Sequence, residues 1–80
     1  MLLNKDKTIL IAYPSASGDI VISENVTTIG DYAFDTCYNL TSIELPDSVT
    51  TIGYMAFNEC NYLTSVKLSN NITSIKDYAF

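Results

Sequence analysis

Hydrophobic and polar residues alternate in two short stretches that recur along the chain. In the stretch LTSIEL, the apolar Leu40, Ile43 and Leu45 are separated by the polar Ser42 and Glu44. Alternation with a period of two is typical of a β-strand with one buried face. A second stretch, VTTIG, alternates in the same way. The pattern therefore predicts two kinds of short strand, the second of which forms a narrow ladder of its own.

Both stretches belong to a longer repeat. Residues 26–48 and 49–71 align without a gap at an offset of 23, and 12 of the 23 aligned residues are identical. Residues 72–80 open a truncated third repeat, and residues 1–25 form an N-terminal capping segment with a degenerate first repeat. A unit of this length cannot enclose its own apolar face, so it must coil once and stack on its neighbour. The prediction is a mainly β solenoid with short parallel strands.

The same alignment assigns the rest of the coil. In DYAFDTC, which begins at Asp31, apolar residues fall at i, i+1 and i+4, which favours one helical or 3₁₀ turn. Residues 2–14 hold two apolar runs around Asn-Lys-Asp-Lys, which predicts a hairpin cap over the first coil. The predicted core consists of positions that are apolar in both repeats. These are Ile29, Phe34, Cys37, Leu40, Ile43 and Leu45, then Ile52, Phe57, Cys60, Leu63, Val66 and Leu68.

Charge and composition exclude several functions. The net charge is −5, from four Lys against nine Asp and Glu, so we expect no nucleic-acid partner, because phosphate binding needs clustered cations. The absence of His excludes Ser-His-Asp and Cys-His catalysis and imidazole metal sites. The carboxylates face different sides of the predicted coil and share no cleft, so we expect no enzyme and no cofactor. No apolar run approaches the roughly 20 residues of a membrane span.

The two cysteines occupy one position of the repeat. Stacked coils place Cys37 and Cys60 about one strand spacing apart, roughly 5 Å. Their side chains then point the same way, whereas a disulfide needs its β-carbons about 3.8 Å apart. With no other Cys or His to complete four zinc ligands, we expect two free thiols in the core and no metal site.

Two surfaces are candidates for contact with a partner. The face outward from the LTSIEL strands, where a solenoid usually binds, carries Ser42, Glu44, Ser65 and Lys67. It lacks the Trp, Tyr and Arg that are typical of interface hot spots. Tyrosines gather instead near the turn after VTTIG and before LTS, either as a ridge that contacts protein or sugar, or as a cover over the core edge. They are Tyr32, Tyr38, Tyr54, Tyr62 and Tyr78.

The repeat resembles a known family. The L-x-x-I-x-L strand and the 23-residue period are those of leucine-rich repeats, and the signature CxxLTSIxLPxSVTTIGxYAF is similar to the BspA-type subclass of bacterial and some protozoan surface proteins. The resemblance implies a curved leucine-rich-repeat solenoid with parallel strands on its concave side and no catalytic residues. The residues that carry it are Cys37, Leu40, Ile43, Leu45, Pro46, Val49, Ile52, Gly53, Ala56 and Phe57.

The resemblance also implies a function and a location. Known relatives act in adhesion to host or neighbouring cells, so it implies a non-catalytic module for protein–protein recognition or cell adhesion. It places the module at the cell surface or in a secreted protein, although this chain shows no signal peptide of its own. A structural spacer or capping segment, and carbohydrate binding through the tyrosines, are the alternatives.

The repeat array stops within its third repeat at the C-terminal end of this chain. Two full repeats and part of a third indicate a fragment of a longer array. Solenoids normally need about three or more units with polar caps, because each coil buries the next. We expect this chain to self-associate, or to stack on further repeats, through the open C-terminal end.

Overall fold

A computed structural model describes residues 1–80 as eight short strands joined by turns, with no helix. The strands are β1 Leu2–Leu3, β2 Ile9–Ala12, β3 Gly18–Val21, β4 Thr28–Ile29, β5 Leu40–Glu44, β6 Thr51–Ile52, β7 Ser65–Lys67 and β8 Ser74–Ile75.

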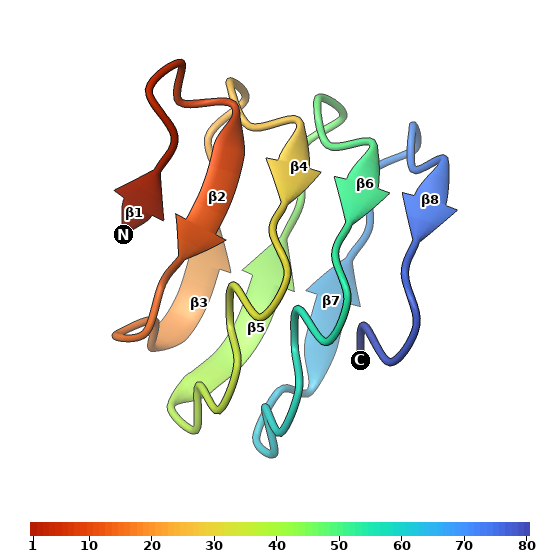
Figure 1. Ribbon diagram of the computed structural model, residues 1–80. Coiled ribbons are helices and arrows are strands. Elements are labelled where there is room, and N and C mark those ends of the chain that lie inside the picture. The colour runs from red at the N-terminus through yellow and green to blue at the C-terminus, as the bar shows by residue number, and fades with distance from the viewer.

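The strands form two sheets that run along the stack of coils (Figure 1). One sheet has the order β1-β2-β4-β6-β8, and the other, which lies farther from the viewer in Figure 1, has the order β3-β5-β7. All pairs are parallel except β1 with β2, which is antiparallel. The leucine-rich-repeat solenoid, its parallel strands, its second ladder and the N-terminal hairpin are thus confirmed.

The register of the sheets follows the repeat. Thr28 pairs with Thr51 and then Ser74, and Ile43 pairs with Val66, so each step along a sheet spans one repeat. The first coil is shorter on one side, because Ile9 of β2 pairs with Thr28 across a connection that is shorter than one repeat. This shorter connection explains why the N-terminal segment shows little likeness to the repeat.

A column of aromatic rings runs through the core. Phe34 stacks on Phe57 with ring centroids 5.0 Å apart and planes 4° apart, and Phe57 stacks on Phe80 at 4.9 Å and 3°. Tyr13 extends the column into the first coil, 5.7 Å from Phe34. Phe34 and Phe57 are buried, whereas Phe80 is 56% exposed at the end of the column. Each ring therefore packs against the ring of the neighbouring coil.

The segment after each glycine corrects one detail of the sequence prediction. It is a succession of turns rather than a helical or 3₁₀ turn, and Tyr32 and Thr36 have φ values of 59° and 55°. Phe34 donates its N–H to Ala56 O of the next coil at 2.7 Å, while Ala33 donates its own within the turn. Beyond its first turn, a helix uses each successive N–H for a bond within the helix. Here alternate N–H groups are diverted to the neighbouring coil, so no helix forms.

The second repeat is less buried than the first. The predicted core residues of the first repeat are all buried, as are Ile52 and Phe57. Cys60, Leu63 and Val66 are half-buried. Leu68, which the sequence places in the core, is instead 44% exposed. The reason is that the strand stack β3-β5-β7 ends at β7, so no further strand covers this side chain.

Glycine is required where successive coils approach most closely. A β-carbon on Gly53 would lie 2.6 Å from the backbone nitrogen of Asp31, and one on Gly30 would lie 2.8 Å from the carbonyl oxygen of Leu10. Both distances are far inside van der Waals contact, and the obstructing atoms belong to backbone. The two glycines therefore set the spacing between coils on this side.

Side-chain hydrogen bonds between coils all have the same direction. Thr50 donates its hydroxyl to Thr27 O at 3.3 Å, and Thr73 donates to Thr50 O at 3.2 Å. Every other bond between coils that involves a side chain also has its donor in the later coil and its acceptor in the earlier one. In the bonds that involve a side chain, each coil thus presents acceptors to the coil that follows it.

Candidate functional site

The β3-β5-β7 face brings four of the predicted contact residues together. Ser42 pairs with Ser65, and Glu44 pairs with Lys67, in adjacent strands. Asp19, on β3, accepts a hydrogen bond from the Ser42 hydroxyl at 2.6 Å. The polar groups of this face therefore already bond to one another across the strands.

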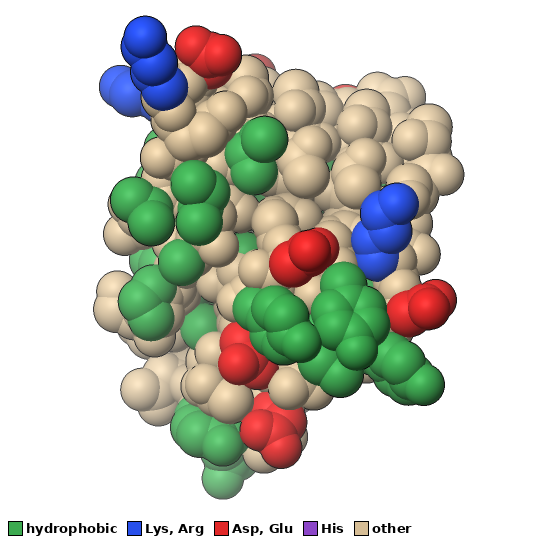
Figure 2. Space-filling model, in the orientation of Figure 1, with side chains coloured by type: hydrophobic (Ala, Val, Ile, Leu, Met, Phe, Trp, Pro, Cys, Tyr) green, Lys and Arg blue, Asp and Glu red, His purple; other side chains and the backbone are tan.

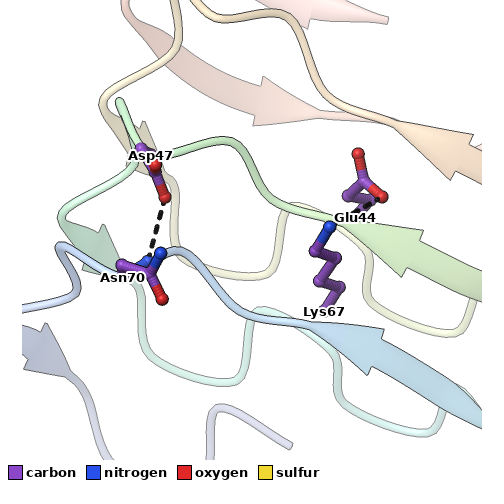
Figure 3. A network of polar contacts seen from close by, with 4 residues as sticks. All are labelled: Glu44, Asp47, Lys67 and Asn70. Carbon is purple, nitrogen blue, oxygen red and sulfur yellow. Dashed lines mark hydrogen bonds and ion pairs between the residues drawn. The ribbon is translucent and has the colours of Figure 1, made fainter.

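One ion pair lies at the edge of the same face (Figure 3). Lys67 Nζ is 3.7 Å from Glu44 Oε1, and the two side chains are 75% and 49% exposed. Beside them, Asp47 accepts a hydrogen bond from the Asn70 N–H at 3.1 Å. An ion pair as exposed as this one contributes about 0–1 kcal/mol. These contacts join neighbouring coils, and the ion pair neutralises the charges of Glu44 and Lys67.

A second surface is formed by three tyrosine rings in successive coils, Tyr32, Tyr54 and Tyr78, here called the tyrosine ladder. The ring centroids of Tyr32 and Tyr54 are 5.8 Å apart at 79°, and those of Tyr54 and Tyr78 are 6.1 Å apart at 84°. Such edge-to-face contacts are favourable for aromatic rings. Tyr32 is 49% and Tyr78 is 71% exposed. Figure 2 shows a patch of hydrophobic side chains at the lower right of this view, with acidic side chains around it.

Tyr38 and Tyr62 do not join the tyrosine ladder. They are 50% and 66% exposed, and neither belongs to an aromatic pair. The five tyrosines that the sequence groups together are therefore one ladder of three and two separate rings.

Asp31 and Asp77 flank the tyrosine ladder and were not singled out by the sequence as part of it. They occupy the same repeat position as Tyr54, one coil before it and one coil after it. Asp31 Oδ1 accepts a hydrogen bond from the backbone N–H of Tyr54 at 2.8 Å, which holds this carboxylate next to the backbone of Tyr54. The signal is present in the aligned segments DYAF, YMAF and DYAF, where Tyr takes the place of Asp in the middle coil.

The two thiols are free and serve the packing between coils. Cys37 Sγ donates to Tyr13 O at 3.3 Å, and Cys60 Sγ donates to Phe34 O at 2.9 Å. Burial raises the pKa of Cys37 to about 11, with a further contribution from the nearby Cys60 and Asp35. Burial also raises the pKa of Cys60. No group of three or more Cys, Asp or Glu side chains is arranged to hold a metal ion.

The C-terminal end of the stack has an open hollow of about 270 Å³. Phe57, Cys60, Leu63, Val66 and Phe80 line it together with Thr64 and Ser65. Because the structure contains no helix at all, none of its segments is a helix that could cross a membrane.

Comparisons with known proteins agree with this architecture. A family model described as the BspA type leucine rich repeat region, with six copies, matches residues 13–80. The crystal structure of a leucine rich repeat protein of T. pallidum superimposes with a TM-score of 0.88 at 28% sequence identity. The alignment covers 98% of this chain and 40% of that protein's chain, so the present chain spans less than half of its length. No curated protein matches the chain.

Proposed function

Because this chain belongs to the BspA-type leucine-rich repeat family, we propose that it is a non-catalytic module that mediates protein–protein recognition or cell adhesion. Solenoids of stacked repeats present extended surfaces on which other macromolecules bind. The family is generally without catalytic activity, and this chain has no His and no clustered metal ligands. Recognition through an exposed surface is therefore the function that suits the fold best.

The tyrosine ladder is the observation that supports this proposal most strongly. Tyrosine is enriched among the residues that dominate binding energy at protein interfaces. Tyr32 and Tyr78 expose 49% and 71% of their surface, and their contacts with Tyr54 hold all three rings in fixed relative positions. Rigid aromatic side chains lose little conformational entropy on binding. The β3-β5-β7 face, by comparison, offers an internally paired set of small polar and charged groups.

A library experiment tests the proposal. The folded chain is immobilised and used to select binders from a displayed library of protein fragments, in parallel with a Tyr54→Ala/Tyr78→Ala variant and a Tyr38→Ala/Tyr62→Ala control. We expect clones that bind the native chain and the control but lose binding to the ladder variant. Circular dichroism establishes that all three proteins are folded.

The alternatives make different predictions in the same experiment. If the chain is a structural spacer or cap, no clone will depend on any of these surface side chains. If it binds carbohydrate, a glycan array will give signals that require the tyrosine ladder, while the protein library gives none. Either outcome would overturn protein recognition by this surface.

We also propose self-association of this 80-residue chain through its open C-terminal end. Leu68, Ile75 and Phe80 are 44%, 49% and 56% exposed there, next to the apolar hollow. Exposed strand edges and apolar side chains of this kind favour pairing with another chain. Light scattering across a dilution series should show a concentration-dependent mass that Phe80→Asp reduces. A mass that stays monomeric at every concentration would contradict it.

The family also supports a proposal about where the protein is located. Because members of this family are typically surface proteins, we propose that the chain is displayed at the cell surface or secreted as part of a larger protein. Labelling of intact cells with a membrane-impermeant lysine reagent, followed by mass spectrometry of peptides from this chain, tests it. Recovery of labelled peptides only from broken cells would contradict a surface location.

A further inference from the structure

We propose that the tyrosine ladder, with Asp31 and Asp77 beside it, binds a cationic side chain, Lys or Arg, from a basic segment of a partner protein. This inference rests on the proposed recognition function and adds the chemistry of the partner to it. Three observations carry it: the positions of the two carboxylates around Tyr54, the exposure of Tyr32 and Tyr78, and the distribution of charge on the molecule.

The two carboxylates lie on either side of the central ring. Asp31, Tyr54 and Asp77 occupy one repeat position in three successive coils, whose strands β4, β6 and β8 pair in register. Neighbouring coils in a parallel sheet are about 4.8 Å apart, so the two aspartates begin about one coil spacing from Tyr54. A cation placed over this ring is therefore within reach of both carboxylates.

The rings offer faces to such a cation. Tyr32 and Tyr78 meet Tyr54 edge to face, at 79° and 84°, so within each pair one ring face is in contact with the edge of the other ring. Tyr32 and Tyr78 belong to one pair each, so each keeps at least one face that no other ring of the ladder covers. The face of an aromatic ring carries negative electrostatic potential, and an ammonium or guanidinium group binds within about 6 Å of the ring centre. Tyr32 and Tyr78 are both exposed, so a partner side chain has access to the ladder.

Both carboxylates have oxygen atoms free to attract a cation that binds to the tyrosine rings. Asp31 uses Oδ1 to accept the Tyr54 N–H, which orients the group and leaves Oδ2 for a partner. Asp77 is exposed and makes no side-chain hydrogen bond or ion pair within the chain. Lys76, the neighbour of Asp77 in sequence, forms no ion pair either, since the one salt bridge of the molecule joins Lys67 and Glu44.

The charge of the whole chain favours the same class of partner. The chain has no Arg and only four Lys, and its net charge is −5. In Figure 2, acidic side chains border the hydrophobic patch, and a basic side chain lies nearby. A negative surface attracts basic segments over distances of about a Debye length. It repels acidic segments, so the cation is what discriminates between partners.

Titration of the isotope-labelled chain with short synthetic peptides tests the proposal by NMR. The first peptide alternates Lys with Gly, the second replaces Lys with uncharged norleucine, and the third replaces it with Glu. We expect chemical-shift changes centred on the tyrosine ladder with the Lys peptide, and none with the other two. Raising the salt from about 0.05 M to about 0.5 M should weaken binding, because the Debye length shortens.

Matched variants locate the binding site. Tyr54→Leu should weaken the binding of the Lys peptide by about 3- to 30-fold, the range expected for loss of a cation–π contact. Tyr54→Phe, which keeps the ring, should bind nearly as tightly as the native chain. Asp77→Asn should weaken binding without affecting folding, because this carboxylate has no partner within the chain. Tyr62→Leu and Glu44→Gln serve as controls and should bind like the native chain.

The outcomes separate this inference from the proposed function. Equal binding of the Lys and norleucine peptides, or an unchanged affinity in Tyr54→Leu, would overturn the cation site. If the library experiment still yields fragments that need the tyrosine ladder, the recognition function stands and only the cation inference fails. If the Lys peptide binds at the ladder but no library fragment needs it, the ladder attracts cations but a basic segment of a partner protein is not its occupant, and both proposals fail.

Discussion

Replacing Phe34 with alanine should destabilise the chain far more than truncating Phe80 at the open end of the aromatic column. Phe34 has no exposed surface and packs against Phe57 at 5.0 Å and Tyr13 at 5.7 Å. Truncation of a buried Phe costs about 3–5 kcal/mol, and the loss of two ring contacts places this site in the upper half of that range. A domain of this size has a total stability of about 4–12 kcal/mol. The variant should therefore be close to unfolding.

Urea and thermal denaturation followed by circular dichroism measure the effect. At about 4–8 °C per kcal/mol for a domain of this size, the melting temperature of Phe34→Ala should fall by roughly 15–40 °C. Phe80→Ala is the matched comparison, because this ring has one stacking partner and is 56% exposed. It should cost about 1 kcal/mol. If Phe34→Ala costs no more than Phe80→Ala, stacking between coils does not stabilise the fold as argued here.

Three further predictions concern the thiols, the coil spacing and the ion pair. Burial raises the pKa of Cys37 in the folded state from 9.0 to about 11. Between pH 9 and 11 the thiol therefore ionises in the unfolded state but stays neutral in the folded state. The stability that the neutral thiol contributes should be complete below pH 9 and should be lost over this range. A Cys37→Ala/Cys60→Ala variant should show a flatter decline over this range in urea titrations at each pH, and an equally steep decline would refute the assignment. Gly53→Ala should lower the melting temperature clearly, since its β-carbon would lie 2.6 Å from backbone of the preceding coil; an unchanged melting temperature would show that the coils can separate freely. Lys67→Met should change stability by no more than about 1 kcal/mol, because its ion pair with Glu44 is solvent-exposed, and a larger loss would mean that the pair is energetically coupled to the core.

The repeat made much of the fold predictable. Once residues 26–48 and 49–71 are aligned, the pairing of Ile43 with Val66 follows, because stacking in register buries the same position in each coil. The place of Tyr13 in the aromatic column could not be predicted in this way. Tyr13 precedes Phe34 by slightly less than one repeat, so it is outside the alignment, and its role depends on the shorter first coil.

The candidate site was predictable only in part. The sequence indicates that tyrosines gather near one turn, since the repeat brings these segments together. It could not separate Tyr32, Tyr54 and Tyr78 from Tyr38 and Tyr62, because ring contacts depend on side-chain directions. Tyr54 and Tyr78 even occupy different repeat positions, and they meet across the coils at 6.1 Å. The sequence also predicts a helical or 3₁₀ turn where the segment after each glycine forms a succession of turns. Local sequence could not show this, because alternate N–H groups of the segment bond to a neighbouring coil.

The common direction of the side-chain hydrogen bonds has a consequence for how such an array can change in length. Each coil receives donors from the coil after it, through groups such as the hydroxyls of Thr50 and Thr73. Suppose that a whole repeat is duplicated in place and in the same orientation. Its donors then face acceptors of the coil before it, and its acceptors face donors of the coil after it. At both junctions of the inserted copy, the threonine hydroxyl of one coil can again donate to a carbonyl of the coil before it, as Thr27, Thr50 and Thr73 do. Gene duplication in units of one repeat therefore lengthens the stack while this set of contacts is kept.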